Sequence, residues 1–241
     1  MKSVFKLLPI MALMMVFAVS CQKPMKPDDG GDNHNPTDSI TQAFVDLGLP
    51  SGLLWATCNI GASSPEEVGD YFAWGDTSPK EMYDWKNYPY CSYAHDRFEL
   101  TKYCTDSCWG FNGIADHLTV LESEDDAAAA NWDEGWRMPT SEDYDELIQN
   151  TECIWTTMNG VNGRLFTAKN GNSVFFPATG FRLDGELICT NLGVYWSSSL
   201  QTNCQVAAWS LHFDYGNMHV CGTYERSRGQ CVRAVYIAKQ Q

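Results

Sequence analysis

The sequence predicts an α+β domain, with helices in the first half of the domain and strands in the second. Two helix starts are indicated where Ser123 and Thr140 each precede an acidic first turn. A hairpin is indicated over 164–176, where two β-rich runs flank Asn-Gly. Since neither a second linker nor a fixed-period repeat follows residue 43, residues 43–241 are expected to form one domain.

The domain is expected to begin with two strands. Residues 44–49 alternate between apolar and polar side chains, Pro-Ser-Gly at 50–52 supplies turn chemistry, and 53–58 follow as a second strand. Residues 59–113 are rich in aromatics and turn formers, and are predicted to be loop.

Two helices and several strands are expected after the loop. Ser123 is predicted to cap a helix that contains four alanines, and Thr140 a second helix with Asp143 three residues on. Further strands are predicted at 194–198, 207–213 and 232–237, the last of them buried. The terminal strand is expected to pair with the first.

The N-terminus has the layout of an export signal. Lys2 and Lys6 precede an apolar stretch, 7–19, that is too short for a membrane span, which indicates a signal peptide over residues 1–20. Residues 18–21 (AVSC) resemble a relaxed bacterial lipoprotein signal, in which Cys21 is acylated (with palmitate, for example) and becomes the mature N-terminus. Ordinary secretion, with Cys21 as a bystander, remains the alternative.

Residues 21–42 are predicted to be a flexible tether, because they are polar and rich in Pro, Gly and Asp. Asp28, Asp29 and Asp32 resemble the acidic stretch that directs some lipoproteins to the cell surface, although a solvated linker explains them equally well. The predicted location is the outer membrane, lipid-anchored and facing the cell exterior.

The net charge and the hydropathy of the chain limit the classes of molecule that it is expected to bind. The 241 residues include 30 acidic and 16 basic side chains, and the net charge of −14 argues against nucleic acid and anionic lipid surfaces. The chain has no apolar run of the roughly 18 residues needed to cross a bilayer. Membrane contact is therefore expected through the lipid anchor alone.

A set of phrases, in order along the chain, resembles one family. They are FVDLGLPSGLLWATCNIGA (44–62), GDYFAWGDT (69–77), GWRMPT (135–140), WTTMNGVNG (155–163), FFPATGF (175–181), YWSSS (195–199) and RGQCVRAV (228–235). Together they resemble the Fibrobacter succinogenes major paralogous domain, which is similar to C-type lectin-like domains. The resemblance implies two helices beside a twisted antiparallel sheet, long irregular loops, and paired N- and C-terminal strands.

Several of the ten cysteines are additions to the usual family text, notably Cys108, Cys189, Cys204, Cys221 and Cys231. Export favours disulfides over zinc. A bridge from Cys58 to Cys153 would join helix to sheet, and Cys104 with Cys108 has helix or loop spacing, with His95 and His117 nearby as the zinc alternative. Two further bridges, with the pairing left open, are expected among Cys189, Cys204, Cys221 and Cys231. Cys91 is a further extra cysteine.

Acidic residues are concentrated between 104 and 163, where thirteen Asp or Glu accompany one basic residue, Arg137. A calcium site would use such clustered oxygens, but carboxylates in the first turns of two helices explain them without an ion. EF-hand spacing and lectin calcium motifs are absent. We therefore predict neither a metal site nor a cofactor.

Two regions are candidates for ligand binding. The loop tryptophans offer an aromatic platform, provided that they do not pack against one another; they are Trp74, Trp85 and Trp109. The second region, within 200–230, mixes polar and aromatic groups suited to recognition, although a solvent-facing sheet would look alike. Its candidates are Gln201, Asn203, Gln205, His212, Asp214, Tyr215, Asn217, His219, Tyr224 and Arg226.

Recognised catalytic motifs are absent from the sequence, including Gly-x-Ser-x-Gly, His-Glu-x-x-His and the phosphate-binding glycine loop. The sequence therefore predicts a non-catalytic, lectin-like binding or adhesion module for an extracellular glycan or protein. A structural surface or appendage component without its own ligand is the alternative. An enzyme with a fold like that of formylglycine-generating enzymes is less favoured.

Overall fold

The computed structural model describes residues 43–94 and 97–237. The predicted signal peptide, the tether and the lipidation residue Cys21 lie outside the described residues, as does His95. Among the described residues, no helix is both long and apolar enough to cross a membrane.

A four-stranded antiparallel sheet joins the two ends of the described chain. Its strands are β1 (Phe44–Asp46), β2 (Leu53–Ala56), β14 (Val235–Ile237) and β5 (Trp136–Arg137), in that order. The last strand therefore pairs with β2, which corrects the prediction that it pairs with the first strand. The burial pattern explains this order, since most of β2 is buried while β1 is largely exposed and suits an edge.

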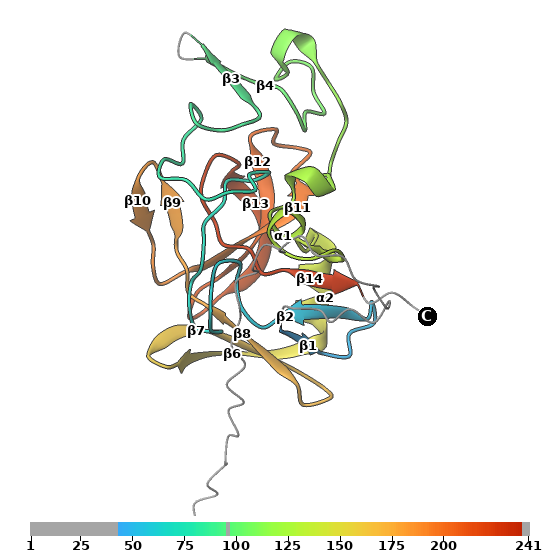
Figure 1. Cartoon of the computed structure of the whole chain (residues 1–241), viewed down its shortest axis with the longest axis vertical. Helices are drawn as coiled ribbons and strands as arrows, with labels where there is room; N and C mark the ends of the chain where they lie inside the picture. Colours follow the sequence, from blue (N-terminus) through green and yellow to red (C-terminus); the bar gives the residue numbers. More distant parts are fainter. Residues whose placement is uncertain (1–42, 95–96, 238–241) are drawn as a thin grey trace, which may run out of the picture.

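Two three-stranded antiparallel sheets form the body of the domain (Figure 1). One consists of β6 (Thr151–Met158), β7 (Val161–Ala168) and β8 (Ser173–Pro177), and it contains the hairpin predicted over 164–176. The other consists of β11 (Gly193–Leu200), β12 (Ala207–Phe213) and β13 (Met218–Glu225). Strand β12 matches its predicted range, whereas β13 was not foreseen as a separate strand.

Two hairpins complete the strands. The region 59–113, predicted to be loop, contains the hairpin of β3 (Cys91–Ala94) and β4 (Arg97–Leu100). Strands β9 (Phe181–Leu183) and β10 (Glu186–Ile188) form the other. In Figure 1, β3 and β4 lie at the end of the molecule opposite β6, β7 and β8.

The helices are short. A 3-10 helix, Ser123–Asp125, precedes α1 (Ala127–Asn131), and the N-cap of α1 is Asp126 rather than the predicted Ser123. Helix α2 (Ser141–Asn150) begins as predicted, with Thr140 in a capping box with Asp143. A further 3-10 helix spans Phe111–Gly113.

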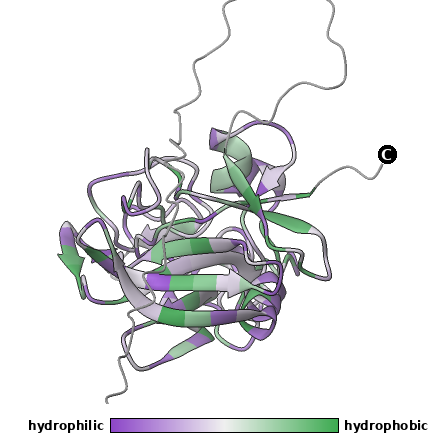
Figure 2. Cartoon of the chain, turned by 90° about the horizontal axis from the view of Figure 1, so that it is seen from below, coloured by the Kyte–Doolittle hydropathy of each residue, from purple (hydrophilic) through white to green (hydrophobic). Residues whose placement is uncertain are grey.

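The core consists of two clusters of buried side chains. One is built around Trp55, Tyr144 and Phe176, and the other around Trp74, Trp136 and Trp196. Many strands in Figure 2 alternate hydrophobic and hydrophilic segments, as expected when one face is buried. Trp55, Trp136 and Trp196 are buried, whereas Trp209 is only half-buried.

The domain is therefore mainly antiparallel β-sheet with two short α-helices, consistent with an α+β or mainly β class. The helices come before most of the strands, as the sequence predicted. Because most of the candidate site residues lie in or beside the third sheet, β11–β12–β13, or flank the β3–β4 hairpin, the geometry of these two elements decides what the surface can bind.

Candidate functional site

Three aromatic rings lie in a contiguous row in the region of the β3–β4 hairpin, which we call the aromatic platform: Trp85, Phe98 and Trp109. Trp85 lies parallel to Phe98, with ring centroids 4.4 Å apart and an interplanar angle of 5°. The Phe98 ring is 6.1 Å from that of Trp109, which is 43% exposed. Two of the three predicted loop tryptophans are thus brought together, joined by a phenylalanine that the sequence analysis missed.

Backbone hydrogen bonds hold the outer ring of the platform in place. Leu100, the last residue of β4, donates its N–H to the Trp109 carbonyl at 2.8 Å. The Trp109 N–H in turn bonds the Asp106 carbonyl at 3.0 Å, within a tight turn. Since β4 also carries Phe98, the same strand fixes both rings, and the platform is ordered before any ligand arrives.

The apolar surface continues beyond Trp109. Phe111 is 40% exposed and Ile114 is 41% exposed, and both follow Trp109 closely in the chain. On the hairpin, the ammonium of Lys86 lies over the ring of Tyr93 at 5.4 Å from its centroid. The region thus presents apolar faces together with hydrogen-bonding groups, a combination that suits an amphipathic ligand.

Three predicted ligand-binding residues are instead buried, which corrects their assignment to a surface. Trp74 and Arg226 are fully buried and Gln205 is 6% exposed. Trp74 donates its indole N–H to the Ser197 carbonyl at 2.9 Å. Burial is the physical reason that none of the three meets a ligand arriving from solvent.

Arg226 and Gln205 fasten the platform's loop to the third sheet. The Arg226 guanidinium lies between the rings of Trp74 and Tyr88, about equally far from each, and bonds the Tyr103 carbonyl at 2.9 Å. Gln205 accepts from the Thr105 N–H at 2.8 Å and donates to its hydroxyl at 2.7 Å. Both residues act as positioning groups, because they anchor the segment that leads to Trp109.

The remaining candidates of the 200–230 region lie at separate places on the third sheet. Asp214, Tyr215 and Asn217 occupy the β12–β13 turn, where the Asp214 carboxylate accepts two backbone N–H groups and Tyr215 is 80% exposed. Gln201 and Asn203 lie in the β11–β12 connection, at the other end of β12. The seven residues of β12 separate the two groups by roughly 20 Å, so one small ligand cannot contact both.

The other three residues of that region form a cluster on the strands between these ends. His212 on β12 faces His219 on β13, with ring centroids 4.9 Å apart. The Tyr224 ring is 6.1 Å from that of His212. Burial and the neighbouring His219 lower the pKa of His212, which favours its neutral form.

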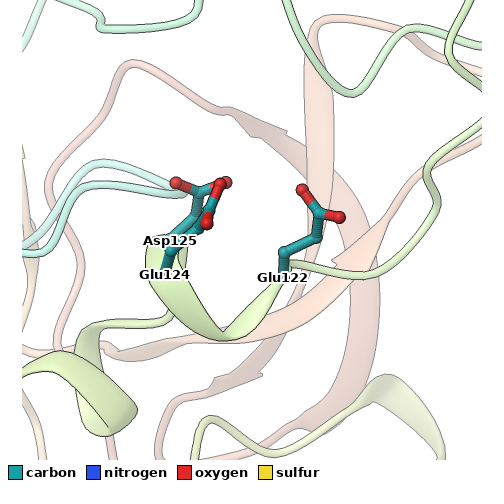
Figure 3. Close-up of side chains that lie close together, drawn as sticks. All are labelled: Glu122, Glu124 and Asp125. Carbon is teal, nitrogen blue, oxygen red and sulfur yellow. The ribbon is translucent and has the colours of Figure 1, made fainter.

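The acidic segment forms one compact cluster of carboxylates, Glu122, Glu124 and Asp125, shown in Figure 3. Their oxygens lie within 4.8 Å of one another, the only such group of three acidic, His or Cys side chains among the described residues. The ammonium of Lys102 contacts all three, at 2.6 Å from Glu122, 3.2 Å from Glu124 and 2.6 Å from Asp125. The positive charge that such a cluster needs is therefore supplied from within the chain.

The Asp125 carboxylate is the centre of this network. It also accepts hydrogen bonds from the hydroxyls of Tyr90 and Tyr103. Although burial alone would raise it, the pKa of Asp125 is held below its ordinary value by Lys102 and the two tyrosines. Burial together with the bond to Asp125 raises the pKa of each tyrosine, so both remain proton donors at neutral pH.

Eight of the nine described cysteines are free thiols in this structure: Cys91, Cys104, Cys108, Cys153, Cys189, Cys204, Cys221 and Cys231. The predicted Cys58–Cys153 bridge is therefore not formed, and the Cys153 sulfur lies 3.8 Å from Arg164 Nη1 instead. Likewise, no described pair among Cys104 and Cys108, or among the four late cysteines, is bridged. Burial raises the pKa of the fully buried Cys231 thiol, which makes it unreactive.

A cleft of about 500 Å³ lies beside the β9–β10 hairpin, and the sequence analysis did not foresee it. Tyr71 and Tyr83 line it, and Arg182 lies over the Tyr71 ring at 5.1 Å. Its lining includes both signs of charge, with Asp70 and Glu81 beside the basic residues. The mixture selects no one class of ligand, so the exposed aromatic platform is the better-defined candidate.

No protein-family model, curated protein or solved structure matches this chain. The resemblance to the Fibrobacter succinogenes major paralogous domain therefore stays a prediction. The assignment of function rests on the geometry of the site and on the sequence.

Proposed function

We propose that this protein is a lipid-anchored, surface-facing binding module that holds an extracellular carbohydrate, without catalysis, on the aromatic platform. The observation that carries the proposal is the contiguous row of Trp85, Phe98 and Trp109, in which the first two rings are stacked and the last is a half-exposed indole tilted by 33°. An indole face packs well against the C–H face of a sugar ring, while its surroundings bond the hydroxyls.

The charge of the protein favours a neutral sugar. The chain carries a net charge of −14 and Asp106 lies in the turn that holds Trp109, so an anionic glycan would meet repulsion. Carboxylates and backbone carbonyls near the platform accept hydrogen bonds from sugar hydroxyls. A neutral oligosaccharide is therefore the proposed class of ligand.

A C-type lectin-like fold is part of this proposal. It is supported by the two short helices, by the sheet that includes strands from both ends of the domain, and by the long irregular segments before α1. The family phrases over 44–235 support it from the sequence side.

The location is proposed from the sequence. The signal-like residues 1–20, Cys21 and the polar tether support acylation at the outer membrane and display on the exterior. Replacement of Cys21 by Ala should release the protein from the membrane fraction. Export also predicts that some of the eight thiols pair in the cell, which thiol counting on protein denatured without reductant would reveal.

The test of the function is a glycan array on the full chain, followed by calorimetry with the tightest neutral oligosaccharide. Trp109→Ala should weaken binding about tenfold or more, which corresponds to roughly 1.4 kcal/mol. The matched control is Tyr215→Ala, which removes an exposed aromatic ring from the far turn of the third sheet and should leave the affinity unchanged.

Two results would contradict the proposal. If Tyr215→Ala abolished binding and Trp109→Ala did not, the ligand would lie on the third sheet instead. If the array showed no glycan and the protein co-purified in a large assembly, the structural, ligand-free alternative would replace this one.

A further inference from the structure

Two histidines face each other on the third sheet, away from the aromatic platform. His212 lies on β12 directly opposite His219 on β13. Their ring centroids are 4.9 Å apart, with an interplanar angle of 53°. His219 is exposed and His212 is half-buried, so the pair opens to solvent on one side only.

This spacing is compatible with two imidazoles bound to a single metal ion. With metal–nitrogen bonds of roughly 2.0–2.1 Å and a tetrahedral angle, the two ring centres come to lie about 5 Å apart. The strand register therefore already holds the rings at a chelating distance, without a ligand to impose it.

One ring nitrogen of His212 is left without a hydrogen bond. His212 Nδ1 is buried and has no hydrogen-bond partner among the described residues. On the neighbouring strand β11, the residue opposite His212 is the buried Val194, which offers no polar side chain.

A third donor stands on the same face. Cys221 follows His219 by two residues on β13, and alternate residues of a strand point to one side. It is half-buried, lies opposite Ser210, and its sulfur is 3.6 Å from the Thr223 hydroxyl. In this structure the ligand atoms of His212, His219 and Cys221 do not all lie within 4.8 Å of one another, so a shared ion requires the Cys221 side chain to rotate toward the two rings.

We propose that His212, His219 and Cys221 form a binding site for a borderline divalent cation of the Zn²⁺ class. Two imidazoles and one thiolate are a nitrogen and sulfur ligand set that Zn²⁺ accepts, with the fourth position left to water. Calcium and magnesium are disfavoured, since they prefer oxygen ligands. Arg228 does not compete for the site, because it stacks on Phe181 and Tyr224 and pairs with Glu225.

The test is a titration of the full chain with Zn²⁺ by calorimetry, with a phosphine reductant present to keep the thiols reduced. One ion should bind the site per chain. Loss of an outer partner of a metal ligand already costs about 10–100-fold in affinity, so His212→Gln and His219→Gln should each cost at least that. The matched control is Tyr215→Ala, which removes an exposed side chain from the neighbouring β12–β13 turn and should bind Zn²⁺ as the parent does.

Cobalt tests the thiolate. The parent chain with Co²⁺ should show a thiolate-to-cobalt charge-transfer band that Cys221→Ser removes. Persistence of that band in Cys221→Ser would overturn the assignment of Cys221 as a ligand. Unchanged Zn²⁺ affinity in His219→Gln, whose side chain is exposed and not needed for folding, would overturn the site itself, even if His212→Gln failed to fold.

Discussion

Lys102 shows how one side chain decides whether an acidic cluster is a cation site. From the sequence alone, calcium ligands and helix-start carboxylates could not be separated, because both place Glu and Asp close together. In the structure, one carboxylate, Asp126, caps a helix, α1. The other three, Glu122, Glu124 and Asp125, neither cap a helix nor surround a metal ion, but surround the Lys102 ammonium. The partner is twenty or more residues away in the chain, and local patterns do not report such contacts.

Removal of this ammonium should create a calcium site. Lys102→Ala leaves three carboxylates facing one another without compensation, and we expect a loss of about 1–3 kcal/mol in the free energy of unfolding, since the group is partly exposed. Calcium at roughly 10⁻⁴–10⁻³ M, the range of weak extracellular sites, should restore part of the loss. Thermal unfolding with and without calcium measures both effects.

The control for this prediction is Lys86→Ala, which removes the same charge from an exposed site over Tyr93. It should change stability by about 0.5 kcal/mol or less and confer no response to calcium. If calcium instead raised the melting temperature of the parent protein, the carboxylates would already accept an ion in competition with Lys102, and the assignment of an internal counter-ion would fail.

Among the helices and strands, those whose sequence signal lies in adjacent residues were the ones that the sequence predicted correctly. The capping box of α2 and the Asn-Gly hairpin of β7 and β8 are written in adjacent residues, and both are confirmed. The β3–β4 hairpin has four-residue strands and no such turn signature, so its region was taken for loop. Phe98, the central ring of the platform, was missed for the same reason. The available signal was its position between the charged residues Arg97 and Glu99.

Burial was the other quantity that local patterns could not supply. Trp74 and Arg226 look like recognition residues in the sequence, but they stack on each other inside the domain. Aromatic and arginine side chains serve interfaces and cores alike, and only tertiary contacts separate the two uses.

The two helix starts should differ in their contribution to stability. Asp126 is 4% exposed, and its carboxylate accepts the N–H groups of Ala128 and Ala129 in α1 as well as that of Met138 beyond the helix. Asp126→Ala removes a cap and leaves a buried N–H unpaired, so we expect a loss of about 2–4 kcal/mol. Thr140→Ala removes only a cap of α2 and should cost about 1 kcal/mol.

Urea unfolding of the two variants beside the parent measures this difference. Equal losses in Asp126→Ala and Thr140→Ala would mean that the bond to Met138 contributes nothing, and that Asp126 serves as a helix cap alone. A smaller loss for Asp126→Ala than for Thr140→Ala would contradict the prediction outright.

For the whole molecule, the sheet β1–β2–β14–β5 is the element that unites the domain. Strand β14 comes from the end of the described chain, β2 from its beginning, and β5 from the segment between α1 and α2. Residues that are almost two hundred positions apart must therefore meet before the sheet exists. We therefore expect the domain to unfold as one cooperative unit, because neither end gains its contacts without the other.

A substitution in β14 should accordingly unfold the whole domain rather than fray its end. Val235 is fully buried and lies opposite both Trp55 and Arg137, whereas Ile237 in the same strand is 53% exposed. Val235→Asp places an unpaired carboxylate in the core, at a cost of several kcal/mol, comparable with the total stability of about 5–15 kcal/mol for a domain. We expect loss of the near-ultraviolet circular dichroism of the buried tryptophans in both core clusters together.

Ile237→Asp, the matched control, should retain that signal and lose about 1 kcal/mol or less of the free energy of unfolding. A Val235→Asp protein that kept its tertiary signal, or that lost it in separate steps on heating, would show that the terminal sheet is not what makes the fold cooperative.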